Sequence, residues 1–172
     1  AIFFDRDGIL NEVVIREGVV ASPRTPDEFL IAREASALVC AAQTSGYLAI
    51  VVTNQPDLSR GLMKQEDLDC MHSLLMQAAP LDDIEVAGSG DNGERRRKPN
   101  PGMLFDAAEK HAISLPDSWI IGDSIKDIHA GENAGVKTIL LETPYNFHVH
   151  GKADKNFSSP GQLLEFIRSL SQ

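Results

Sequence analysis

Residues 1–10, AIFFDRDGIL, are the stretch that decides the fold. The apolar run 2–4 predicts a buried strand, and two carboxylates, Asp5 and Asp7, follow it at once. Side chains alternate along an extended chain, so both carboxylates would face the same way at the carboxyl end of this strand. Two adjacent anions repel each other, which is unfavourable unless a cation or a proton transfer needs both.

The rest of the chain alternates between strand-like and helix-like segments. Further strands are expected at 47–52, 84–87, 119–121 and 136–141. Apolar residues spaced three, four and seven apart predict helical faces at 35–42, 68–78, 103–108 and 163–170. This alternation predicts an α/β fold, a Rossmann-like three-layer sandwich with a mainly parallel sheet, in one domain spanning 1–172. The segment 144–160 is expected to be the least ordered.

The charge and the sulfur-containing residues limit the partners. A net charge of −9 argues against nucleic acid or an anionic membrane as a partner. Cys40 and Cys70 form no CxxC pair, and we interpret both as small buried side chains. The lack of a disulfide pattern is typical of a protein in a reducing, cytoplasmic compartment. No apolar run reaches the roughly 20 residues of a membrane span. We expect a monomer or a weak homodimer, with the methionines as core filler (Met63, Met71, Met76 and Met103).

Polar residues follow three of the expected strands. Asp5 and Asp7 end the first, Thr53 and Asn54 end the second, and Asp123 ends the strand at 119–121. Parallel strands present their carboxyl ends at one edge of a sheet, where ligands of such folds bind. The sequence therefore predicts a ligand site at this edge.

These stretches resemble the four motifs of the haloacid dehalogenase superfamily of phosphohydrolases. The first motif, DxDG, matches residues 5–8, and the second matches Thr53 in VVTNQ. The third matches Lys98 in RKPNPGM, and the fourth, GDxxxD, matches residues 122–127. The motifs occur in the order of the family and span most of the chain. The resemblance implies a haloacid dehalogenase-like fold.

The resemblance also implies roles for these side chains. Asp5 would be the nucleophile that forms an aspartyl-phosphate, and Asp7 the general acid that later acts as base. Thr53, the Asn54 amide and Lys98 would hold the phosphoryl oxygens.

A magnesium site is implied at the same place. Its ligands would be Asp5, the backbone carbonyl of Asp7, and Asp123, with Asp127 nearby. Asp127 has an alternative interpretation. It could be an acidic residue in the first turn of a helix, where the helix dipole alone favours a negative charge.

A closer resemblance is to the histidinol-phosphate and heptose-bisphosphate phosphatase branch. FFDRDG, VVTNQ, the pair at 60–61 and RKPNPGM carry it, and it implies that Gln55, Arg60 and Arg97 bind substrate. Many members of this branch have a zinc loop before RKP. Residues 86–99 contain no Cys or His, so we expect no zinc.

The implied substrate is a small phosphorylated metabolite. A heptose 1,7-bisphosphate, hydrolysed at position 7, is the first hypothesis, and histidinol phosphate is the alternative. A nucleic-acid end phosphatase is disfavoured by the net charge, and a non-catalytic phosphate-binding domain by the presence of both Asp5 and Asp7.

The chain has no room for a large cap domain. We expect an open site, with the flap 11–26 and the loop 88–97 as its rims. His148 and His150 would face the same way on a strand, but no third metal ligand accompanies them.

Overall fold

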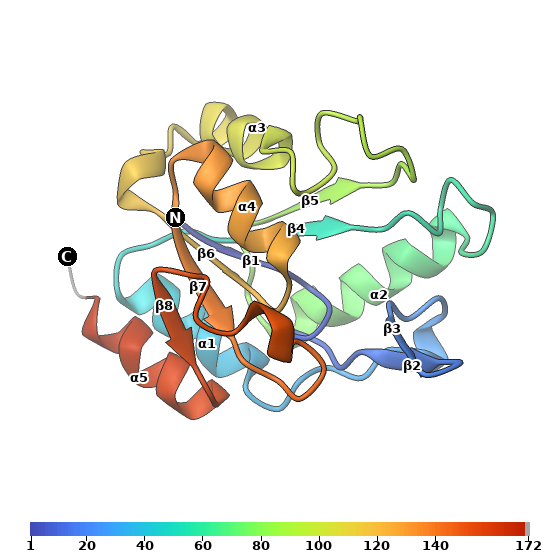
Figure 1. Ribbon diagram of the computed structural model, residues 1–172, viewed down its shortest axis with the longest axis horizontal. Coiled ribbons are helices and arrows are strands. Elements are labelled where there is room, and N and C mark those ends of the chain that lie inside the picture. The colour runs from blue at the N-terminus through green and yellow to red at the C-terminus, as the bar shows by residue number, and fades with distance from the viewer. Residues whose placement is uncertain (171–172) are drawn as a thin grey trace.

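The computed structural model describes residues 1–170 and shows a six-stranded sheet between two layers of helices (Figure 1). All neighbouring strands in this sheet are parallel, in the order β5-β4-β1-β6-β7-β8. The strands are β1 (Ile2–Phe4), β4 (Ala49–Asn54), β5 (Asp83–Ala87), β6 (Trp119–Gly122), β7 (Lys137–Leu141) and β8 (Lys155–Phe157). The helices are α1 (Ala35–Thr44), α2 (Gln65–Ala78), α3 (Gly102–His111), α4 (Ile125–Ala134) and α5 (Pro160–Ser169). The predicted three-layer α/β fold is confirmed.

Strand alternation explains why the sheet is covered on both faces. Along β1, Ile2 and Phe4 point to the layer of α1, α2 and α5, whereas Phe3 points to the layer of α3 and α4. All three side chains are fully buried. A continuous apolar run is what a strand buried on both faces of a parallel sheet requires.

The register of the central strand brings the polar strand ends together. β1 lies between β4 and β6, with Phe4 level with Val51 on one side and Ile121 on the other. The residues that follow these positions therefore lie at the same edge of the sheet. Asp5, Thr53 and Asp123 reach one site for this reason.

Short elements fill the connections. A two-stranded hairpin, β2 (Val14–Arg16) and β3 (Val19–Ala21), and the 3₁₀ turn η1 (Pro26–Glu28) lie between β1 and α1. Other 3₁₀ turns are η2 (Leu115–Asp117) and η3 (Phe147–Val149). Between β4 and β5 the chain forms one helix, α2, so residues 1–170 contain no large cap, as the sequence predicted. Figure 1 shows the hairpin and the loops after β4 and β5 at the right, on the side of the strands' carboxyl ends.

Several expectations about local structure were incomplete or wrong. The strand expected at 47–52 is displaced to 49–54, because its ladder with β5 continues through Thr53 and Asn54. The segment 144–160 contains η3 and β8, two short elements that were not predicted. Cys40 and Cys70 are exposed, because each lies on the outer face of its helix. Met76 is also half exposed, whereas the other three methionines are buried as expected.

No helix within residues 1–170 combines the length and the apolarity needed to cross a membrane.

Candidate active site

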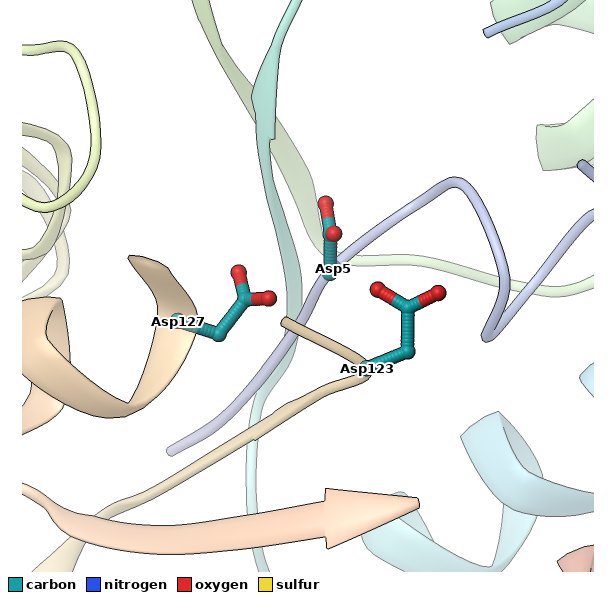
Figure 2. A group of neighbouring side chains, drawn as sticks. All are labelled: Asp5, Asp123 and Asp127. Carbon is teal, nitrogen blue, oxygen red and sulfur yellow. The ribbon is translucent and has the colours of Figure 1, made fainter. Parts of the chain in front are cut away.

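Three carboxylates converge at the edge of the sheet (Figure 2). Asp5 follows β1, Asp123 follows β6, and Asp127 lies in the first turn of α4. One oxygen atom from each comes within 4.8 Å of the others, and the three carboxyl groups point into a common space. In the part of the chain that the structure describes, this is the one group of three potential metal ligands.

Lys98 lies between two of these carboxylates. Its Nζ is 2.9 Å from Oδ1 of Asp5 and 2.5 Å from Oδ1 of Asp127. Burial lowers the pKa of Lys98, but the two carboxylates outweigh it and raise this pKa above its ordinary value. Burial, together with Asp127, raises the pKa of Asp5 well above its ordinary value, against the attraction of Lys98. One ammonium group therefore does not balance the charge of the cluster.

Asp127 fills two roles at once. Its Oδ2 accepts hydrogen bonds from the backbone N–H and the hydroxyl of Ser124, which forms the capping box of α4. Its Oδ1 contacts Lys98. A Cβ atom at Gly122 would overlap the Asp127 carboxyl group, so glycine is needed at this point of GDxxxD. The helix cap thus fixes a carboxylate that also belongs to the cluster.

Asp123 is held by the loop after β7. The Tyr145 hydroxyl donates to its Oδ2 at 2.6 Å, and the Asn146 side chain donates to its backbone carbonyl at 2.8 Å. Burial and Asp127 raise the pKa of Asp123 to about 7, although the Tyr145 hydrogen bond and Lys98 act in the opposite direction. A Cβ atom at Gly8 would overlap Oδ2 of Asp123, which explains the glycine of DxDG.

Five donor groups surround the carboxylate of Asp7. Its Oδ1 accepts from two nitrogens of Arg6 and from Asn11, and its Oδ2 accepts from Ser22 and Gln55. Burial raises the pKa of Asp7, but Arg6 and these hydrogen bonds outweigh it and lower the pKa. Arg6 is itself fully buried, with its guanidinium carbon 5.4 Å from the centre of the Phe29 ring. Asp7 is therefore held as a carboxylate.

The motif after β4 connects the remaining predicted residues. The Asn54 side chain makes two hydrogen bonds of 2.9 Å to the backbone N–H and carbonyl of Lys98, which fixes the loop that carries the lysine. Gln55 donates to the hydroxyl of Thr53 at 2.8 Å as well as to Asp7. Thr53 is buried beside these groups.

A cleft of about 420 Å³ opens over the cluster. Most of the predicted site residues line it: Asp5, Asp7, Asn54, Gln55, Arg60, Arg97, Lys98 and Asp123. The flap contributes its apolar wall through Val13, Val19 and Val20, whereas the loop 88–97 contributes only Arg97. Arg97 is buried, and it donates to the Ser89 carbonyl at 3.0 Å.

Sequence reasoning missed several residues of this site. Arg24, Asp57 and Lys126 also line the cleft, and Tyr145 contacts the metal-ligand candidate Asp123. Arg24, Asp57 and Tyr145 lie outside the four motifs, and Lys126 is a variable position within GDxxxD, so no spacing signal identified them. His148 and His150 do not share a strand face, because residues 147–149 form η3 and His150 contacts Asn146.

The donor set fits magnesium. The three converging groups are carboxylates, and hard oxygen atoms are the ligands that Mg²⁺ prefers. Three carboxylates and one ammonium group, that of Lys98, meet here, so negative charge exceeds what Lys98 neutralises. A divalent cation would remove this imbalance.

Known proteins are similar to this chain in sequence. A family model described as HAD-hydrolase-like matches residues 95–155. The D-glycero-α-D-manno-heptose-1,7-bisphosphate 7-phosphatase of Burkholderia mallei is 35% identical over 82% of this chain and 78% of its own length. The corresponding β-anomer enzyme of Pasteurella multocida is 31% identical over 99% of this chain and 97% of its own.

A solved structure extends the match to the whole fold. The D,D-heptose 1,7-bisphosphate phosphatase of B. bronchiseptica, complexed with magnesium and phosphate, superimposes with a TM-score of 0.80 at 25% identity. The match covers 98% of this chain and 96% of the other. The chain therefore belongs to the haloacid dehalogenase-like hydrolases, in the family of the heptose-1,7-bisphosphate 7-phosphatases.

Proposed function

We propose that this protein is a Mg²⁺-dependent phosphatase that removes the phosphate at position 7 of a D-glycero-D-manno-heptose 1,7-bisphosphate. The observation that carries the proposal is the convergence of Asp5, Asp123 and Asp127 beneath one cleft, with Lys98 paired to Asp5 and Asp127. The relatives named above support the substrate. Since their names include both anomers, the proposal does not choose between them.

The first step makes and breaks one bond at phosphorus. A carboxylate oxygen of Asp5 attacks the phosphorus atom, and the bond from phosphorus to the sugar oxygen breaks. Asp7 donates a proton to the departing oxygen, so the sugar leaves as an alcohol. In the second step water attacks the aspartyl-phosphate and gives a proton to Asp7. The products are inorganic phosphate and the regenerated Asp5 carboxylate.

The surroundings of Asp7 suit the second step directly. Arg6 and the other three donor contacts hold it as the carboxylate, which is the form that accepts a proton from water. To act first as an acid, Asp7 has to be protonated and release at least one of these donors. Ser22, on the flap, and Gln55 both bind Oδ2 and are the neutral donors that can be exchanged.

Charge around the phosphoryl group would be balanced by fixed groups. Lys98, Thr53 and the Asn54 amide would hold its oxygens. Asp5, the Asp7 carbonyl and Asp123 would hold Mg²⁺, with Asp127 beside it. When bound, the metal neutralises the carboxylates and the phosphate together.

An Asp5→Asn variant tests the proposed nucleophile. We expect Mg²⁺-dependent phosphate release from a heptose 1,7-bisphosphate to fall by more than about a thousandfold, with the circular dichroism spectrum unchanged. Asp117→Asn is the matched control, because Asp117 is an exposed residue of η2 outside the cleft, and it should retain activity. Unchanged release by Asp5→Asn would remove Asp5 as the nucleophile.

A direct comparison of substrates tests the sugar. The value of kcat/KM should be higher for a heptose 1,7-bisphosphate than for histidinol phosphate, and phosphorus NMR should show the phosphate at position 1 retained. A preference for histidinol phosphate would favour the alternative function. A monomer or weak homodimer remains a prediction, which size-exclusion chromatography can test.

A further inference from the structure

Two arginines from different loops meet at the rim of the cleft. Arg24 lies between β3 and η1, and Arg60 lies between β4 and α2. Asp57 bridges them: its Oδ2 is 2.7 Å from Nε of Arg24, and its Oδ1 is 3.2 Å from an η nitrogen of Arg60. All three residues line the same cleft as the catalytic carboxylates.

This cluster carries an excess of positive charge. One carboxylate neutralises only one of the two guanidinium groups, and Arg97 and the exposed Lys126 line the cleft as well. The net charge of the whole chain is −9, so a cationic rim here runs against the general trend. A local cationic site is what an acidic protein needs in order to bind a multiply charged anion.

The two guanidinium groups keep donors free for a ligand. Each has five N–H groups, and within the described residues each gives one nitrogen to Asp57. The side chains of Arg24 and Arg60 remain 31% and 54% exposed. Arginine presents a planar fork that matches the oxygens of phosphate, and Asp57 holds both forks at the rim.

A purely structural role explains less of this arrangement. The Arg24–Asp57 pair could serve only to attach the flap to the loop after β4. Partly exposed ion pairs of this kind contribute little to stability, and an attachment of this kind needs no second arginine. The cleft also has an apolar wall from Val13, Val19 and Val20, against which a carbon skeleton can lie between two charged ends.

We propose that Arg24 and Arg60, held by Asp57, form an anion subsite for the phosphate group that remains on the substrate. This inference rests on the proposed function, because it assumes that the other phosphate lies at Asp5. The subsite would make the enzyme selective for sugar bisphosphates over monophosphates. It would also disfavour substrates that carry an ammonium group, which the arginines repel.

The test compares two sugars that differ only in the retained phosphate. For the wild type, kcat/KM is measured with a heptose 1,7-bisphosphate and with the heptose 7-phosphate. In Arg24→Gln, the ratio of the two values should fall at least about tenfold, and further in the double variant with Arg60→Gln. An equal loss for both sugars, or no loss, would overturn the subsite in favour of a structural attachment of the flap.

Arg16→Gln is the matched control. Arg16 belongs to the same flap (residues 11–26) as Arg24 and pairs with Glu28, but it does not line the cleft. Its substitution should leave the selectivity ratio at the wild-type value. A ratio that falls in this variant as well would show that any disturbance of the flap produces the effect.

A binding measurement separates failure of the subsite from failure of the proposed function. If the wild type hydrolyses neither heptose phosphate, the proposed function is wrong. Calorimetry with glucose 1,6-bisphosphate and glucose 6-phosphate still tests the subsite. The subsite is supported if the wild type binds the bisphosphate more tightly than the monophosphate and Arg24→Gln abolishes this difference. Equal binding of the two sugars by the wild type would overturn the subsite.

Discussion

The hydroxyl of Tyr145 donates a hydrogen bond of 2.6 Å to Oδ2 of Asp123, across 22 positions of sequence. With Oδ2 oriented in this way, the other carboxylate oxygen can face the space shared with Asp5 and Asp127. Groups that hydrogen-bond to metal ligands fix their orientation, and their loss weakens metal binding about 10–100-fold.

Tyr145→Phe should therefore weaken Mg²⁺ binding by about tenfold or more, without loss of the fold. Isothermal titration of Mg²⁺ into the variant measures the affinity directly, independently of activity. Tyr47→Phe is the matched control, because Tyr47 packs against the core and lies outside the site. Wild-type affinity in the Tyr145 variant would contradict this role.

Gly8→Ala tests the close approach behind Asp123. Gly8 has φ +85°, and a Cβ there would also overlap Asp123. Gly18 has a similar φ of +79°, but a Cβ added there would have no atom within 4 Å. Gly18→Ala therefore measures the cost of backbone strain without any steric overlap. Both should lose about 1 kcal/mol of unfolding free energy from strain, and only Gly8→Ala should lose Mg²⁺ affinity in calorimetry. Equal affinities in the two variants would contradict the steric argument.

Lys98→Met removes the cation between two buried carboxylates. Without metal, urea denaturation should show a loss of about 3 kcal/mol of unfolding free energy, because Asp5 and Asp127 keep uncompensated charge. Saturating Mg²⁺ should reduce the deficit. Lys110→Met is the control: Lys110 is 57% exposed and pairs with Asp83, so its loss should lower the unfolding free energy much less than the loss of Lys98 does. If Mg²⁺ does not change the loss of unfolding free energy in Lys98→Met, the stabilising role of Lys98 is independent of metal binding.

His72 predicts a pH dependence of stability. It accepts a hydrogen bond from the buried Arg6 at 3.2 Å. Burial and Arg6 lower its pKa from 6.5 to about 4, against Asp69 and Asp7, which raise it. Between these pH values the unfolded chain binds the proton and the folded protein does not, so stability falls as pH falls from 6.5 towards 4.

His72→Gln keeps an acceptor for Arg6 but cannot titrate. Urea denaturation at pH 7 and pH 4.5, with EDTA in both buffers, should show a loss of stability in the wild type about 2 kcal/mol larger than in the variant. Parallel losses in the two proteins would show that His72 is not the titrating group.

The sequence predicted the parts of the site that depend on strand ends. Asp5, Thr53 and Asp123 follow apolar runs, and a parallel sheet has to bring such positions to one edge. Lys98 was predicted by resemblance, and the structure places it against Asp5. The exposed Cys40 and Cys70 were predicted wrongly, because a small apolar residue within a helix does not reveal which face it occupies.

By itself, the sequence determined the alternation of strands and helices and the four motifs, because both are local patterns with fixed spacing. Only the tertiary structure decided that Asp127 contacts Lys98, that Tyr145 orients Asp123, and that Arg24 meets Arg60 through Asp57. These contacts join segments that are distant in sequence. The packing of the sheet and helices determines which of these residues meet, and the spacing of residues along the sequence does not predict that packing.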